Sequence, residues 1–362
     1  MEFGLSSDQR MLQDSVARYL ADACPLHHVR DTAAGTQAVS ATLTAGLADL
    51  GVPGIVIPAE YGGMGLGLLE AALVAEALGH RVAPAHFTGA HVMAPLAIMA
   101  GGSEAQQQTW LPRLASGEAT AAVAMSESVL SRDDAGVRAK DGRLDGTALF
   151  VLDAADAEVI VVADTQGRQH LVRADAAGVE LIALPTIDKT RSLGELRLSG
   201  VAAEPLPASG RETTRRIIDA GRTMLAADTL GAGTAMIEQA VAYAGQRMQF
   251  GRPIGSFQAV KHMCAEMAAA LEPCRSLVWY AAHAFDHVPE ESALMACHAK
   301  SHLSEVGRFV ARTSTEVHGG MGFTDLAGLH YWFKRIGLNR QLLGGPELVR
   351  NDAARLQGWI AA

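Results

Sequence analysis

The amino-acid sequence predicts a mainly helical α+β protein in which a β-rich middle part separates two helical parts. Apolar residues recur at spacings of three and four in both outer thirds of the chain, as in amphipathic helices. Short β-rich runs separated by Gly, Asp and Ala fill the middle third. With 362 residues and 49% hydrophobic composition, the chain can bury more than one core. We therefore expect three domains, with boundaries at 1–118, 119–208 and 209–362.

The first domain is predicted to be helical from its apolar spacing. The helical pattern begins with Met11, Leu12, Val16, Tyr19 and Leu20, and it continues through LLEAALVAEALG. Residues 51–67, GVPGIVIPAEYGGMGLG, interrupt this pattern with glycines and prolines that favour turns over helix interiors. We expect a structured loop there.

The middle domain is predicted to be a small β-sandwich or barrel. Its candidate strands are TAAVAMS, ALFVL, EVIVVAD, HLVRA, VELIAL and ELRLSG, at near-regular spacing. After residue 209 the helical period returns for the rest of the chain. Long helical segments are expected near 211–246, 254–286, 290–317 and 341–360.

Composition excludes several classes of partner. The net charge is -9, with acidic and basic residues mixed along the chain, so neither nucleic acid nor an anionic membrane surface is expected. MEFGLSSDQR lacks the features of a signal peptide, and the longest apolar stretch is too short to span a bilayer. We expect a cytoplasmic protein without a disulfide framework or a metal site, because no CxxC pair occurs among the four cysteines, Cys24, Cys264, Cys274 and Cys297.

Five segments together resemble one known family. FGLSSDQRMLQDSVARYL, GVPGIVIPAEYGGMGLG, LPRLASGEATAAVAMSE, RMQFGRPIGSFQAVKHMCAEM and VHGGMGFTDLAGLHYWFKR are similar, in order and spacing, to segments of the acyl-CoA dehydrogenases. The resemblance covers essentially the whole chain. It implies a C-terminal four-helix bundle, assembly as a dimer or a dimer of dimers, FAD as cofactor, an acyl-CoA thioester as substrate and an electron-transferring flavoprotein as electron acceptor.

The resemblance also implies that RMQFG reaches across a subunit interface to the ADP half of the neighbour's FAD. Arg247 would meet the pyrophosphate with a charged, planar donor fork, and Phe250 would lie against the cofactor. Gly251 would let the backbone turn closely. The remaining implied cofactor contacts are Ser126, Gln258, Glu316, Gly319 and Gly320. The alternative for Arg247 and Phe250 is a solvated cation and a helix-packing aromatic.

One of these positions departs from the family. Glu316 stands where the family has a glutamine. An extra carboxylate near phosphates is unfavourable because like charges repel, although it could still accept a hydrogen bond from a ribityl or ribose hydroxyl.

The family's reaction needs a carboxylate that removes the α-proton of the thioester while hydride leaves the β-carbon for the flavin. The two places where members carry this glutamate correspond to Gly344 and Gly221, so neither holds an acid. Glu347 and Asp228 are the candidate replacements. Alternatively, Glu347 is an acid that stabilises a helix start, and Asp228 is a polar contact within the bundle.

Asp219 and Arg222 preserve a family Asp-x-x-Arg pair associated with the CoA moiety, which implies a substrate contact. The alternative is an intrahelical ion pair. In the middle domain Ser126 keeps a family hydroxyl at the flavin-ring site, but the family's ring-contacting Trp-Ile-Thr corresponds to Phe150, Val151 and Leu152, without the hydroxyl.

Residues that would serve a neighbour's FAD are therefore largely kept, and those that would serve the chain's own flavin ring and proton abstraction are largely absent. This pattern is similar to the half-site subunit of α2β2 heterotetrameric acyl-CoA dehydrogenases, notably those of steroid side-chain catabolism, whose paralogous subunit supplies the base and ring pocket. Two alternatives stay open. One is a self-sufficient homo-oligomeric dehydrogenase using Glu347 or Asp228, and the other is a non-catalytic relative that binds acyl-CoA or a partner.

Overall fold

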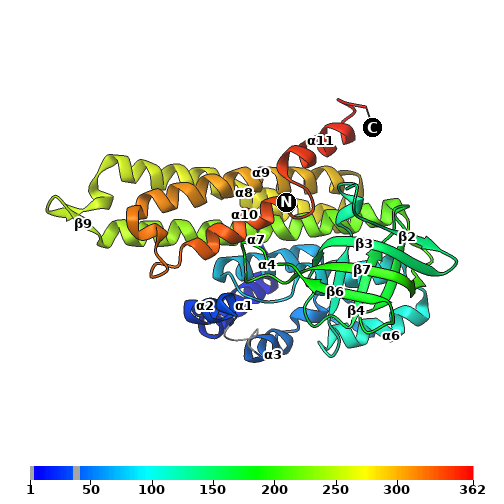
Figure 1. Ribbon diagram of the computed structural model, residues 1–362. Helices are drawn as coiled ribbons and strands as arrows, with labels where there is room; N and C mark the ends of the chain where they lie inside the picture. The colour runs from blue at the N-terminus through cyan, green and yellow to red at the C-terminus, as the bar shows by residue number, and fades with distance from the viewer. Residues whose placement is uncertain (1–3, 36–40, 362) are drawn as a thin grey trace.

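The computed structural model describes residues 4–35 and 41–361. Long helices run side by side as a bundle, and a curled sheet lies against one end of it (Figure 1). The N-terminal helices pack along the side of the bundle (Figure 1). The mainly helical α+β class predicted from the sequence is confirmed.

The N-terminal part is helical, as predicted. Its first helix begins with a capping box in which Ser6 and Gln9 exchange side-chain and backbone hydrogen bonds. Residues 51–67 form two short 3-10 turns, η1 (Val52–Gly54) and η2 (Ala59–Tyr61), which confirms the predicted structured loop. The other elements are α1 (Ser7–Ala23), α2 (Leu26–Ala34), α3 (Ala41–Asp49), α4 (Leu68–Arg81), the π-helix η3 (Thr88–Met93), α5 (Ala94–Gly101) and α6 (Glu104–Ala115).

The middle part is one mixed sheet of eight strands. The strand order is β6-β7-β3-β1-β4-β5-β8, β2 pairs with β3, and β1 and β4 are parallel. Each of the six predicted runs overlaps a strand, whereas β2 and β8 were not predicted. The bounds are β1 (Ala121–Ala124), β2 (Gly136–Lys140), β3 (Arg143–Leu152), β4 (Val159–Ala163), β5 (Gln169–Arg173), β6 (Val179–Ala183), β7 (Leu193–Ala202) and β8 (Glu204–Pro205).

Long helices return after the sheet. The bounds are α7 (Arg211–Gln246), β9 (Met248–Gln249), β10 (Arg252–Pro253), η5 (Ile254–Ser256), α8 (Gln258–His287), α9 (Pro289–His318), η6 (Gly319–Phe323), α10 (His330–Gln341) and α11 (Pro346–Leu356). The segment predicted near 341–360 contains helix α11, which begins later, at Pro346, whereas α10 was not among the expected segments. Gly344 has a φ of +105° and Pro346 begins the next helix, so the chain turns between α10 and α11.

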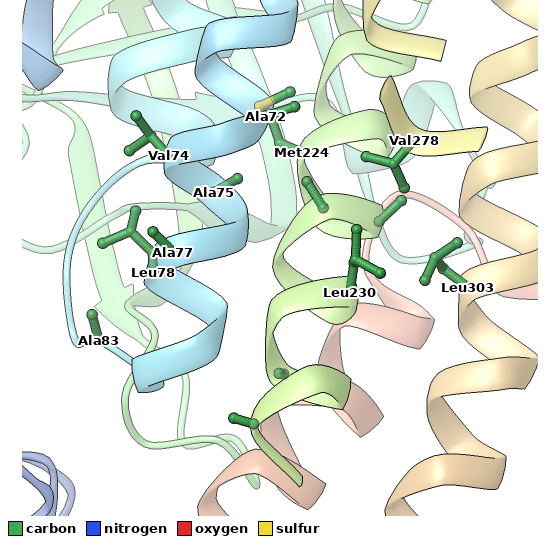
Figure 2. Packing of buried hydrophobic residues seen from close by; sticks show 14 of the residues in the cluster. Ala72, Val74, Ala75, Ala77, Leu78, Ala83, Met224, Leu230, Val278 and Leu303 are labelled. Carbon is green, nitrogen blue, oxygen red and sulfur yellow. The ribbon is translucent and has the colours of Figure 1, made fainter. Parts of the chain in front are cut away.

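Helices α4 and α7 cross closely and join the N-terminal part to the bundle. A Cβ on Gly79 would lie 2.0 Å from the Asp228 carbonyl oxygen, and one on Gly231 would lie 1.8 Å from that of Glu76. Only glycine permits such a backbone approach. One apolar cluster therefore continues from α4 through α7 to α8 and α9, as Ala72, Ala75, Met224, Leu230, Val278 and Leu303 illustrate (Figure 2).

Two short links join the three parts of the chain. The first runs between α6 and β1, and the second between β8 and α7. The predicted boundaries after residues 118 and 208 fall inside these links. None of the helices among the described residues combines the length and apolar character that crossing a bilayer requires.

Candidate functional site

Two regions hold most of the predicted site residues, and they lie at opposite ends of the bundle. The distal end, away from the sheet, consists of the hairpin Met248–Pro253 and the turn Gly319–Leu326 (Figure 1). The Tyr243 ring stacks on His318 with 4.7 Å between centroids, which joins the end of α7 to the end of α9. The fold thus brings Arg247 and Gly319 to one end of the bundle.

The distal hairpin carries an unusual aromatic at its tip. Phe250 and Gly251 have φ values of +52° and +77°, the pattern of a type I′ turn. Phenylalanine is disfavoured in this left-handed region, yet it is placed here with 91% of its surface exposed. Its ring meets Phe257 edge-on at 6.1 Å, and it is not packed into the bundle. A strained, exposed aromatic indicates contact with another molecule.

The rest of the distal end is open and partly cationic. Arg247 ends α7 and is exposed, and Gln258 is the exposed first residue of α8. A Cβ on Gly319 or Gly320 would meet no atom within 4 Å, so their backbone faces free space. Glu316 is exposed one turn earlier on α9. A guanidinium, an aromatic ring and bare backbone are groups that suit an adenosine diphosphate moiety.

The second region is a cavity of about 450 Å³ between the β part and the turn that joins α10 to α11. Ser126 and Phe150 line it from the β part, and Leu342 and Gly344 line it from the turn. The Ser126 hydroxyl donates a long hydrogen bond of 3.4 Å to the Phe150 carbonyl oxygen. Phe150 has a φ of +53° within an irregular stretch of β3, so its backbone departs from the regular strand.

Neither Phe150 nor Leu152 has a side chain that could donate a hydrogen bond to a flavin ring here. Leu152 is only 5% exposed and is paired with Val123 and Leu193 in the sheet. The Arg132 guanidinium lies 5.3 Å from the Phe150 ring centroid and lines the same cavity. The cavity therefore does not fit the family's flavin ring: the hydroxyl at position 152 is absent, and an arginine lies over the aromatic.

Of the two positions where the family carries its base, Gly221 is closed by packing, and Gly344 has a backbone conformation that strains any other residue. A Cβ on Gly221 would lie 2.5 Å from both the Leu343 Cδ1 and the Met93 Sδ atoms. At Gly344 the φ of +105° strains any other residue, and a Cβ would lie 3.2 Å from Val129 Cγ1. Neither position has room for a glutamate without displacing its neighbours.

Glu347 lies at the rim of this cavity, in the first turn of α11. Its side chain is 72% exposed and forms ion pairs with Arg340 at 3.3 Å and Arg350 at 3.9 Å. Its own backbone N–H, followed by these two arginines, lowers the pKa of the carboxyl. A general base works best with a pKa near the operating pH, so these contacts oppose a proton-abstracting role.

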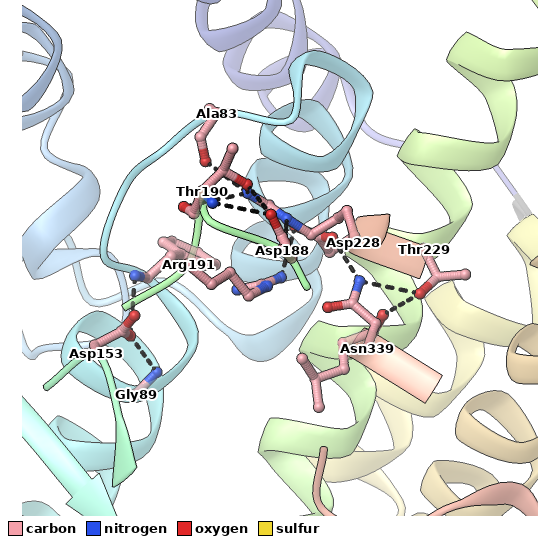
Figure 3. A network of polar contacts seen from close by, with 12 residues as sticks. Ala83, Gly89, Asp153, Asp188, Thr190, Arg191, Asp228, Thr229 and Asn339 are labelled. Carbon is pink, nitrogen blue, oxygen red and sulfur yellow. Dashed lines mark hydrogen bonds and ion pairs between the residues drawn. The ribbon is translucent and has the colours of Figure 1, made fainter. Parts of the chain in front are cut away.

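Asp228 does not line the cavity but is part of a buried polar network (Figure 3). It is 3% exposed and forms ion pairs with Arg191 at 2.9 Å and Arg335 at 3.1 Å. Asn339 donates a 2.6 Å hydrogen bond to its other oxygen. These contacts match the polar-contact alternative for this residue.

Arg335 is the centre of that network and was not singled out from the sequence. It is 1% exposed and donates to Asp188 at 2.6 Å, to the Thr190 hydroxyl at 2.5 Å and to the Ala83 carbonyl at 3.1 Å. Burial is the largest single influence and opposes ionisation of Asp188, but Arg335, Arg191 and the hydrogen bonds from Thr190 together outweigh it and lower the pKa of that carboxyl. The network joins α10 to α7 and to the segment before β7 (Figure 3).

Asp219 and Arg222 form the buried intrahelical pair that was the alternative to a CoA contact. Their closest charged atoms are 3.5 Å apart. Arg222 also donates to Asp352 at 2.8 Å and to the Leu343 carbonyl at 3.0 Å, so it fixes α11 and the turn before it. Burial is the main cause that raises the pKa of Asp219 to about 6. A contact of this pair with CoA stays a prediction.

Comparisons with known proteins agree with this fold. Residues 6–118 match the family model "Acyl-CoA dehydrogenase, N-terminal domain", and residues 208–357 match "Acyl-CoA dehydrogenase, C-terminal domain". The chain is 32% identical over 344 residues to acyl-CoA dehydrogenase IpdE2 of Mycobacterium tuberculosis, covering 94% of this chain and 95% of that protein.

Two solved structures are similar over nearly the full chain. The ChsE4-ChsE5 complex from Mycobacterium tuberculosis matches with a TM-score of 0.91 and 27% identity, covering 100% of both chains. A variant of the Tcur3481-Tcur3483 steroid ACAD matches with a TM-score of 0.87 and 27% identity, covering 97% of this chain and 98% of that one.

Proposed function

Because this chain belongs to the acyl-CoA dehydrogenase family, we propose that it is the half-site subunit of a heteromeric, FAD-dependent acyl-CoA dehydrogenase. The observation that carries the proposal is the position of its open cofactor-binding groups. They lie at the distal end of the bundle, and the chain's own cavity lies at the other end (Figure 1). Groups so far from the chain's own cavity would serve a neighbouring subunit's cofactor.

FAD is the cofactor of this family, and when bound it accepts the hydride from the acyl thioester. The distal end fits the ADP half of the cofactor, whereas the chain's own cavity does not fit the flavin ring. In the assembly, Arg247 would bind the pyrophosphate, Phe250 would lie against the cofactor and Gln258 would contact the flavin. Gly319 and Gly320 let the backbone approach. The partner subunit supplies the ring pocket and the carboxylate that removes the α-proton.

The substrate we propose is a steroid side-chain thioester or another bulky acyl-CoA. Support comes from the similar structures, one described as a steroid ACAD and one as a complex of two different chains. An electron-transferring flavoprotein is the proposed electron acceptor. The partner is a paralogous subunit in an α2β2 arrangement.

The test compares the chain purified alone with the chain co-expressed with a paralogous subunit. Alone, it should hold FAD substoichiometrically, because its own cavity lacks the ring contacts. In the mixed assembly, visible flavin absorbance should approach one FAD for each pair of unlike subunits. Tight, stoichiometric FAD in the homomer would contradict the proposal and favour the self-sufficient dehydrogenase. A flavin-free mixed assembly would favour the non-catalytic relative.

A further inference from the structure

The outer face of α9 carries an exposed pair of opposite charges beside the distal end. Arg312 and Glu316 are 65% and 57% exposed, and their closest charged atoms are 3.9 Å apart. Both line a shallow surface groove of about 290 Å³. Glu316 lies one helical turn before Gly319, whose backbone faces open space. The pair is thus next to the surface assigned above to the partner's cofactor.

The carboxylate of Glu316 creates an electrostatic difficulty at that surface. A pyrophosphate and a carboxylate repel each other, and the repulsion grows when docking of a partner removes water from between them. The difficulty is lessened if a cation stays beside the carboxylate. On a helix, a residue four positions earlier lies on the same face, and Arg312 has this spacing.

Arg312 is better placed for this task than the other arginine of the groove. Arg308 already pairs with Glu305 at 3.0 Å. The 3.9 Å between Arg312 and Glu316 exceeds hydrogen-bond distance, so this pair is loose and free to tighten. On this face of α9, Arg308 is therefore held by a close ion pair, whereas Arg312 is free to move closer to Glu316.

We propose that Arg312 neutralises Glu316 when the partner's FAD docks on the distal end, so that a carboxylate can occupy a position beside the cofactor. Arg312 is then a positioning residue that acts through Glu316. This inference rests on the half-site function proposed above. It also explains how this chain accommodates an acid where its family has a neutral glutamine.

A double-mutant cycle tests the proposal on the assembly of the full chain with its paralogous subunit. FAD affinity is measured by titrating the deflavinated assembly with FAD and following flavin fluorescence. Arg312→Ala should weaken FAD by about threefold to fivefold, and Glu316→Gln should tighten it by about threefold to fivefold, as expected for single partly exposed charges. The double variant should lie within about twofold of Glu316→Gln alone, because Arg312 then has no charge to offset.

Arg308→Ala is the matched control. It removes a guanidinium from the same groove, but one held by Glu305, so FAD affinity should change by less than about twofold. Circular dichroism and co-purification with the partner check that each variant folds and assembles. An equal loss from Arg312→Ala in both backgrounds would overturn the proposal, as would a Glu316→Gln variant that binds FAD no more tightly.

The outcome also separates this inference from the proposed function. If FAD binds the mixed assembly but the cycle shows no coupling, only the role of Arg312 is lost. If the wild-type assembly binds no FAD at all, the half-site function and this inference are both overturned.

Discussion

The distal end of the bundle and the cavity beside the sheet, which the proposed function assigns to two parts of a cofactor site, differ in the exposure of their side chains. At the distal end Phe250 is 91% exposed and Gly319 faces open space. At the cavity Leu343 and Met93 occupy the space around Gly221. The groups that we propose serve another molecule are exposed in the isolated chain, whereas a position that we propose has lost its role is filled by apolar packing.

The difference also has an energetic side. A non-glycine residue held in the left-handed region costs on the order of 1–3 kcal/mol. At Phe250 the ring is 91% exposed and therefore buries little surface that could offset that cost. The packing of Leu343 and Met93, by contrast, stabilises the chain itself by excluding water from a buried surface. Stability of the lone chain and function of the assembly therefore favour different residues in the two regions.

The largest effect is expected from Gly221→Glu. The new Cβ would overlap Leu343 and Met93 at 2.5 Å, and a carboxylate would be buried among apolar groups. We expect the free energy of unfolding, measured by urea denaturation, to fall by about 3 kcal/mol or more. Gly245→Glu is the matched control on the same helix, since a Cβ at Gly245 meets no atom within 4 Å and stability should change little. A Gly221→Glu chain that is stable and binds FAD without a partner subunit would contradict the proposed difference between the two regions.

Arg247→Ala should have the next largest effect, on the cofactor rather than on folding. The side chain is exposed, so the lone chain should unfold as the wild type does. The mixed assembly should bind FAD about 10- to 50-fold more weakly, because a charged hydrogen bond to pyrophosphate is lost. Arg247→Lys should fall between the two, since it keeps the charge without the planar fork. Unchanged flavin occupancy in the alanine variant would remove Arg247 from the site.

Phe250→Asn should act with opposite signs on the chain and on the assembly. Asn-Gly is the preferred pair for a type I′ turn, so the lone chain should gain about 0.5–1 kcal/mol in urea denaturation. The assembly should hold FAD about fivefold less tightly, because an aromatic contact is lost. A variant that is neither more stable nor weaker in FAD binding would show that the exposed ring has no function.

The sequence predicted single long helices better than contacts between distant parts of the chain. Helix α7 was predicted at 211–246, where the structure has it, because apolar spacing over a long segment is a strong local signal. Helix α10 was not among the predicted segments, and the segment predicted near 341–360 begins before α11 does, although Gly344, Gly345 and Pro346 mark the turn there. The buried network could not be predicted, because Arg335 meets Asp228 and Asp188 across sequence separations of 107 and 147 residues. No local pattern reports such pairings, which depend on how three parts of the chain pack.

The smallest effect is expected from Glu347→Gln, and it tests whether the cavity retains any catalysis. Glu347 is an acid that lines the cavity together with Gly344, which stands where the family carries its base. Its own backbone N–H and two arginines favour the ionised form of its carboxyl. Lowering the pKa of a carboxylate weakens it as a base, and a side chain 72% exposed is not held in one geometry. Turnover of the mixed assembly with an acyl-CoA should therefore stay within about twofold of wild type. A loss of kcat by about 100-fold or more, with FAD content intact, would identify Glu347 as the base, because this is the lower range for a general base. The self-sufficient homomeric dehydrogenase would then be the better interpretation.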